Sequence, residues 1–144
     1  MAHVLVPIDG SEPSWAALDL AAETVADGKI TVMHVIDPLA TMHGGDEDGY
    51  YNPAAYEMAR ERGERLLEEA ESELASTGVL DHTEFESVIK AGRPARTIVD
   101  YIDEEDIDHV IIGSHGRSGV SRIVLGSVAE TVARRAAIPV TIVR

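Results

Sequence analysis

Residues 109–127 read HVIIGSHGRSGVSRIVLGS, and this stretch decides the fold. Its first five residues form an apolar run with the length of a buried strand, and glycines follow at once. Ser127 stands where a helical pattern begins, so the stretch predicts a buried strand that leads through a glycine-rich loop into a helix. The four glycines of this stretch are Gly113, Gly116, Gly119 and Gly126.

The same alternation of strand and helix extends outward over the whole chain. Strands alternating with helices imply right-handed crossovers and a parallel sheet that helices cover on both faces, so we predict an α/β fold. The expected strands span residues 3–8, 30–36, 84–90, 109–113 and 140–143. The expected helices run from Ser11 or Ser14 to Val25, over 53–76, over about 94–102 and over 127–137.

Length and composition bound the class of protein. The chain has 144 residues, which suits a single domain over 1–144, and its aromatic content of 4% leaves the core to Val, Ile, Leu and Ala. It has no cysteine, which excludes disulfides, thiolate chemistry and cysteine-ligated zinc. The first residues lack the pattern of a signal peptide and no apolar run has membrane-spanning length, so we expect a cytoplasmic protein without a membrane partner.

The charge balance is strongly acidic. Asp and Glu number 26 against 12 Lys and Arg, which gives a formal net charge of −14. Such a charge opposes binding to nucleic acid and to anionic membranes. The acidic residues are spread along most of the chain, a pattern that favours a halophilic protein adapted to concentrated salt; the alternative is an ordinary acidic protein.

The glycine-rich stretch is the best candidate for a ligand site. Ligands of open α/β sheets lie beyond the carboxyl ends of the strands, where the strand order reverses. Glycines let backbone N–H groups approach an anion closely, and Ser127 adds a hydroxyl at the positive end of a helix dipole. Phosphate binding is therefore the favoured interpretation, although a strand-to-helix crossover often needs a glycine and a serine cap for structural reasons alone.

The spacing Gly113-x2-Gly116-x9-Gly126-Ser127 resembles the nucleotide signature of the universal stress protein family, in its ATP-binding branch. The segments Val4–Ser11 and His34–Asp37 resemble that family as well. The resemblance implies a flavodoxin-like, Rossmann-like sheet of five parallel strands in the order 3-2-1-4-5. It also implies ATP, ADP or AMP bound at the switch between the first and fourth strands.

The resemblance also assigns roles to individual residues. Asp9 would meet the ribose, Pro7 would help to shape the pocket, and the backbone of Val35 would hydrogen-bond the adenine edge. A divalent cation, Mg²⁺ or Mn²⁺, would be held through the phosphate oxygens. The ribose and phosphates would be bound by Gly113, Gly116, Gly126, Ser127 and Val128.

Each assignment has a plainer alternative. Asp9 with the following glycine is also a common turn, and Val35 is otherwise an ordinary core residue. Arg117 and Arg122 lie within the loop and could add charge-assisted hydrogen bonds to phosphate, or be surface arginines. His115 could stand as an acid or base or simply face solvent, and no set of nucleophile, base and orienting acid can be assembled. We therefore expect binding, with slow ATP hydrolysis at most.

Two other nucleotide-binding classes are disfavoured. An NAD-dependent enzyme should carry Gly-x-Gly-x-x-Gly after its first strand, where this chain has DGSEPS, and no P-loop motif is complete. The remaining rival is a dimeric interaction protein of the same fold with a vestigial pocket or another small ligand. The resemblance implies a homodimer through Val140–Val143, an apolar strand whose edge would otherwise be exposed. We expect a sensor or switch with an unidentified downstream protein partner.

Overall fold

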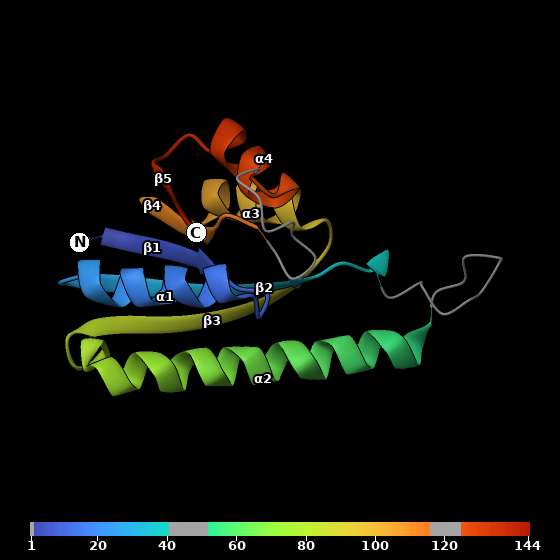
Figure 1. Cartoon of the computed structure of the whole chain (residues 1–144), viewed down its shortest axis with the longest axis horizontal. Coiled ribbons are helices and arrows are strands. Elements are labelled where there is room, and N and C mark those ends of the chain that lie inside the picture. Colours follow the sequence, from blue (N-terminus) through green and yellow to red (C-terminus); the bar gives the residue numbers. More distant parts are fainter. Residues whose placement is uncertain (1, 41–51, 116–124) are drawn as a thin grey trace.

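In the described part of the chain, five parallel strands form one sheet in the order β3-β2-β1-β4-β5, as the family resemblance implies (Figure 1). The computed structural model describes residues 2–40, 52–115 and 125–144. Since β1 pairs with β2 on one side and with β4 on the other, the strand order reverses at β1. The strands are β1 (Ala2–Pro7), β2 (Gly28–Ile36), β3 (Thr83–Ala91), β4 (His109–Gly113) and β5 (Val140–Val143).

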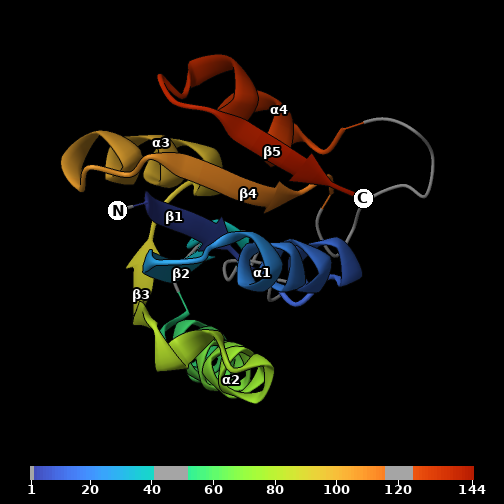
Figure 2. The same ribbon diagram turned by 90° about the vertical axis from the view of Figure 1, so that its left-hand side faces the viewer.

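Among the described residues, four α-helices cover the two faces of the sheet. Helices α1 and α2 lie on one face and α3 and α4 on the other (Figure 2). Proline occupies the first turn of α1, α2 and α3, where its missing N–H has no helical partner to lose. The helices are α1 (Glu12–Thr24), α2 (Pro53–Thr77), α3 (Pro94–Glu104) and α4 (Ser127–Arg135), with a short 3-10 turn η2 (Val79–Asp81).

Capping explains where the first two helices begin. The Ser11 hydroxyl accepts a hydrogen bond from the N–H of Ser14, so Ser11 is the N-cap of α1. The Asn52 side chain does the same for α2, where it accepts from the N–H groups of Ala54 and Ala55. Helix α2 ends at Gly78, whose φ of 84° is the left-handed conformation that glycine adopts without strain.

Two apolar cores lie on the two sides of the sheet. Alternate residues of each strand point to opposite faces, so β1 sends Val4 and Val6 to the α1 and α2 side and Leu5 to the α3 and α4 side. In α2 the buried stripe consists of Gly63, Leu67, Ala70 and Leu74. Ala59 and Leu66 flank this stripe and are half-buried.

Candidate functional site

The chain leaves β1 through a short turn that is tied internally. The Oδ1 atom of Asp9 accepts a hydrogen bond from the N–H of Ser11 at 2.9 Å, and Gly10 between them has φ of 88°. The Ser14 hydroxyl donates to the carbonyl of Ser11 at 2.8 Å. The turn alternative for Asp9 is therefore realised. An ionised carboxylate accepts about four hydrogen bonds, so Asp9 retains the capacity to accept from ribose hydroxyls.

The turn after β1 and the end of β4 are in direct contact. The Ser11 hydroxyl donates to the carbonyl of His115 at 3.4 Å. Ser114 is buried, and its carbonyl accepts from the N–H of Gly126 at 2.6 Å, which brings the start of α4 back to the end of β4. The structure thus gathers Asp9, the end of β4 and the N-terminus of α4 at one edge of the sheet, at the point where the strand order reverses.

Two of the predicted phosphate-loop glycines also have a packing role. A Cβ at Gly113 would lie 2.8 Å from the carbonyl carbon of Pro13 and from the nitrogen of Ser14, so glycine lets the start of α1 pack on β4. A Cβ at Gly126 would lie 3.0 Å from the Cα of His115. These close approaches are made by the chain itself, so they account for glycine at both positions without a ligand.

The N-terminus of α4 presents backbone donors at this edge. Its N-cap, Gly126, has no side chain, and no side chain among the described residues caps the helix. The first N–H groups of a helix have no partner within the helix, and here they belong to Ser127, Val128 and Ala129. Donors of this kind, with the positive end of the helix dipole, suit a phosphate group.

The backbone of β2 determines which side its polar groups face. The N–H and C=O of a strand residue point to the same side, and that side alternates along the chain. The carbonyl of Met33 accepts from the N–H of Ile8 on the β1 side, and the carbonyl of Ile36 accepts from the N–H of Gly92 on the β3 side. Val35 lies two residues after Met33 along the strand, so its backbone N–H and C=O face the same side as those of Met33, toward β1.

Val35 lies where β1 has already left the sheet. The last paired positions of β1 and β2 are Pro7 and Met33, and two residues later the chain turns away at Asp9. The side chain of Val35 packs against the core on the α3 and α4 side, as its plainer alternative states. Its backbone, however, faces the side on which β1 no longer pairs with β2.

The predicted site residues therefore fall into three groups. The structure brings Asp9, Gly113 and Gly126 together, and it places Pro7 at the buried end of β1, paired with Met33, two residues before Val35. Ser127 is exposed at the start of α4, and Val128 is half-buried beside the core of that face. The remaining predicted residues lie outside the described part of the chain: Gly116, Gly119, Arg117 and Arg122.

The sequence did not predict the hydrogen bonds of three polar side chains in this region. Ser11 and Ser14 form bonds between and within loops, and His34 of β2 bonds the end of β1. The Nδ1 atom of His34 lies 2.9 Å from the carbonyl oxygen of Ile8. The sequence predicts Ser11 as a helix cap, but the hydrogen bond from Ser11 to His115 joins residues 104 positions apart. No local pattern signals such a contact.

The titratable groups with shifted pKa values gather at the opposite, amino end of the sheet. A hydrogen bond with Glu86 raises the pKa of Lys29, and the same bond lowers the pKa of Glu86. Burial raises the pKa of Tyr101 to about 12. Burial, followed by repulsion from Lys29, lowers the pKa of His3, whose Nε2 atom lies 2.7 Å from the hydroxyl oxygen of Thr31.

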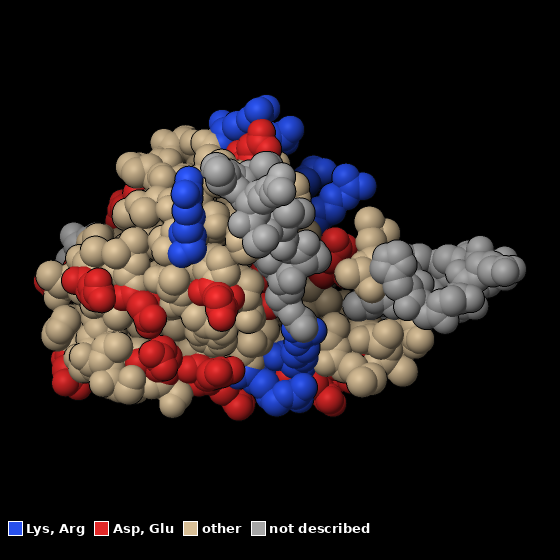
Figure 3. Space-filling model, in the orientation of Figure 1, with Lys and Arg blue, Asp and Glu red and all other residues tan. Residues whose placement is uncertain are grey.

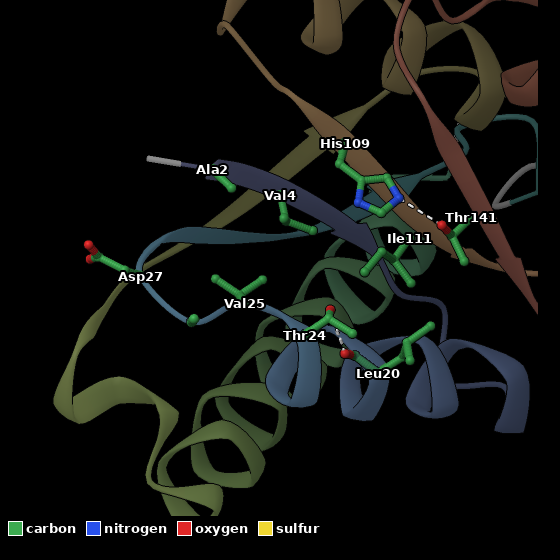
Figure 4. A pocket seen from close by; sticks show the side chains of 10 residues that line it. Ala2, Val4, Leu20, Thr24, Val25, Asp27, His109, Ile111 and Thr141 are labelled. Carbon is green, nitrogen blue, oxygen red and sulfur yellow. Dashed lines mark hydrogen bonds between the residues drawn. The ribbon is translucent and has the colours of Figure 1, made fainter.

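A cavity of about 570 Å³ opens at this same amino end, between α1 and the sheet (Figure 4). The Nε2 atom of His109 lies 2.7 Å from the hydroxyl oxygen of Thr141 at its wall, and the remaining lining is mainly apolar. None of the predicted nucleotide residues lines it. The lining residues are Ala2, Val4, Leu20, Thr24, Val25, Ala26, Asp27, His109, Ile111 and Thr141.

The described ranges 2–40, 52–115 and 125–144 lack two kinds of feature. Within them, no group of three or more His, Asp or Glu side chains is arranged to hold a metal ion. In the same ranges, no helix combines the length and the apolar character needed to cross a membrane.

Comparisons with known proteins place the chain in a family. Universal stress protein MJ0531 of Methanocaldococcus jannaschii is 30% identical over 98% of this chain and 81% of its own length. The solved structure of protein MJ0577, from the same organism, aligns with a TM-score of 0.71 at 28% identity, covering 99% of this chain and 94% of that one.

A solved universal stress protein in complex with cAMP is also similar, with a TM-score of 0.67 at 27% identity, covering 99% of this chain and 96% of that one. The model of the Universal stress protein family matches residues 1–144. Together with the sheet order, these matches show that the chain belongs to the universal stress protein family.

Proposed function

We propose that this protein binds an adenine nucleotide, with ATP as the favoured ligand, at the carboxyl edge of its sheet and acts as a dimeric sensor or switch. The observation that carries the proposal is the junction of the turn after β1, the end of β4 and the N-terminus of α4 at the strand-order reversal. Ribose, phosphate and adenine each meet a suitable group along this edge.

The described residues fit a nucleotide in three places. The Asp9 carboxylate can accept from ribose hydroxyls, and the N–H groups of Ser127 and Val128 suit phosphate oxygens. The backbone of Val35 faces the side where β1 no longer pairs with β2, and it offers a donor and an acceptor to the adenine edge. The similar protein that is solved with cAMP supports an adenine nucleotide as the class of ligand. Mg²⁺ or Mn²⁺ would then accompany the phosphates.

A binding role suits these groups better than rapid turnover. The junction supplies hydrogen-bond donors and acceptors, and its serines already serve as a helix cap and as links between loops. Chemistry on the terminal phosphate needs a positioned base or an activated water. We therefore assign this protein slow ATP hydrolysis at most, and its output is the bound or empty state that a downstream partner reads.

We also propose a homodimer through β5. This strand ends the sheet, and all four of its residues, Val140–Val143, are only half-buried in the single chain. An apolar edge strand is a template for pairing with another strand, and pairing about a two-fold axis satisfies both copies at once. Sedimentation should give twice the 15.5 kDa mass of one chain, and a monomer at micromolar concentration would count against the dimer.

The rival function, an interaction protein with a vestigial or different pocket, is favoured by two observations. Gly113 and Gly126 are explained by packing of the chain on itself, and Asp9 already orders its own turn. Both functions predict the same fold and the same dimer. They differ only in whether a nucleotide binds at the junction.

Thermal unfolding with and without ATP and Mg²⁺ separates the two functions. Ligand at 100 times its dissociation constant should add about 2.7 kcal/mol to the free energy of unfolding, which for a domain of this size raises Tm by roughly 5–10 °C. An unchanged Tm at millimolar ATP, under conditions where the protein is folded, would rule out the nucleotide function.

Asp9→Asn is the matched variant for this experiment. The Asn side-chain oxygen can still accept from the N–H of Ser11, so the turn and the Tm without ligand should be retained. Loss of the charge should weaken ATP binding about tenfold, which at the same ATP concentration leaves about 1.4 kcal/mol of stabilisation. Gly126 is a poor position for this purpose, because any side chain there would press on His115 with or without a ligand.

A further inference from the structure

His34 makes a specific bond to the end of the first strand. It belongs to β2, and its ring nitrogen Nδ1 lies 2.9 Å from the carbonyl oxygen of Ile8. A carbonyl oxygen only accepts hydrogen bonds, so Nδ1 carries the proton and donates. The bond joins a side chain of β2 to the backbone of the residue that immediately precedes Asp9.

This bond extends the attachment of β1 beyond its paired region. Regular pairing with β2 ends at Pro7 and Met33, and the N–H of Ile8 then donates to the carbonyl of Met33 at 2.8 Å. The His34 ring bonds the carbonyl oxygen of the same residue. Both backbone polar groups of Ile8 are therefore tied to β2, one by backbone and one by a side chain.

Helix α2 fixes where the ring can lie. Gly63 is buried in the face of α2 that packs on the sheet, and a Cβ built on it would lie 2.6 Å from Cδ2 of His34. The same Cβ would lie 3.0 Å from Cδ1 of Ile89 on β3. The absent side chain of Gly63 thus makes the space that the ring occupies, and the helix backbone limits movement of the ring away from Ile8.

From Ile8 the bonds continue into the candidate site. Asp9 follows directly and accepts from the N–H of Ser11, whose hydroxyl donates to the carbonyl of His115 beside the start of α4. We propose that His34 is a positioning residue that holds the end of β1 so that the Asp9 turn faces the nucleotide. This assignment rests on the proposed nucleotide function for its ligand, but the geometry of the turn can be tested without one.

Two substitutions separate the hydrogen bond from the packing of the ring. In His34→Asn the side-chain amide nitrogen can occupy the place of Nδ1 and donate to Ile8, whereas His34→Leu fills space without a donor. Both variants lose contacts against α2, so a lower Tm in both is uninformative. The informative readouts are the amide exchange rate of Ser11 in nucleotide-free protein and the dissociation constant for ATP.

His34→Leu should speed exchange at Ser11 about three- to tenfold and weaken ATP binding by a similar factor, the loss expected for one hydrogen bond. His34→Asn should stay within about twofold of the wild type in both readouts. Wild-type values in His34→Leu, or equal losses in the two variants, would overturn the proposal. If the wild-type protein binds no ATP, the proposed function fails by itself, and the exchange rates still decide whether His34 positions the turn.

Discussion

Among single residues, His3 makes the stability of the fold dependent on pH. Its pKa is lowered because the ring is partly buried and because Lys29 is close by. The folded protein therefore gives up the His3 proton more readily than the unfolded chain, whose His pKa is about 6.5. The charged groups around the ring are Lys29, Glu86, Asp108 and Glu105.

The sign of the effect follows from proton binding. Between the lowered folded pKa and about pH 6.5 the unfolded chain binds more protons, so the free energy of unfolding should rise with pH across that window and level off above it. His3→Gln can keep the hydrogen bond to Thr31 and removes the titration. Urea unfolding at several pH values should show a smaller rise in that variant. An unchanged rise would show that His3 is not its source.

The individual site residues were only partly predictable from the sequence. The start of α4 could be named because a helix start has a local pattern, whereas the role of Asp9 came from the family resemblance. The packing reason for glycine at positions 113 and 126 could not be predicted, since it depends on which distant backbone lies against each position. His34 and Ser11 were missed for the same reason, because their partners are chosen by the tertiary fold.

At the level of elements, packing around Gly63 of α2 should outweigh the higher helix propensity of alanine. Replacing a glycine inside a helix by alanine ordinarily stabilises by about 1 kcal/mol. At Gly63 the new methyl group would press on the His34 ring and on Ile89. We therefore expect Gly63→Ala to lower the free energy of unfolding by about 1–3 kcal/mol, the usual cost of overpacking.

Urea unfolding of Gly63→Ala measures that cost, and Ala75→Gly supplies a control on an exposed part of the same helix. The control should lose only the propensity difference of about 1 kcal/mol. A Gly63→Ala protein that is more stable than the wild type would mean that the ring moves aside freely, and that α2 does not fix it.

The elements themselves were largely predictable. All five strands and four α-helices occur where apolar periodicity, prolines and caps place them, because buried parallel strands and amphipathic helices carry strong local patterns. The 3-10 turn Val79–Asp81 was not predicted, since three residues are too few to set a period. The strand order came from the family resemblance and is confirmed by the pairing of β1 with both β2 and β4.

For the whole molecule, the net charge of −14 sets the dependence on salt. Acidic side chains are scattered over the face that carries α1 and α2, and basic side chains gather in few places on it (Figure 3). Repulsion among them should be screened as the Debye length falls from about 30 Å at 0.01 M to about 3 Å at 1 M salt. We propose that the protein is adapted to concentrated salt.

Melting in 0.05 to 2 M KCl tests this proposal. Tm should rise steeply up to about 1 M, where screening is nearly complete. Glu69→Lys with Glu73→Lys, both on the exposed face of α2, should raise Tm at low salt and reduce the rise. A Tm that does not change between 0.05 and 1 M would contradict salt adaptation and indicate an ordinary acidic protein.

The central claim is that an adenine nucleotide binds at the junction of β1, β4 and α4. Backbone amide NMR during titration with ATP and Mg²⁺ tests it most directly, because each amide reports its own position. We predict saturable shifts at Gly10, Ser11 and Val35 and at the first N–H groups of α4. No shifts at millimolar ATP, or shifts confined to the cavity residues Val25, Ile111 and Thr141, would contradict the account.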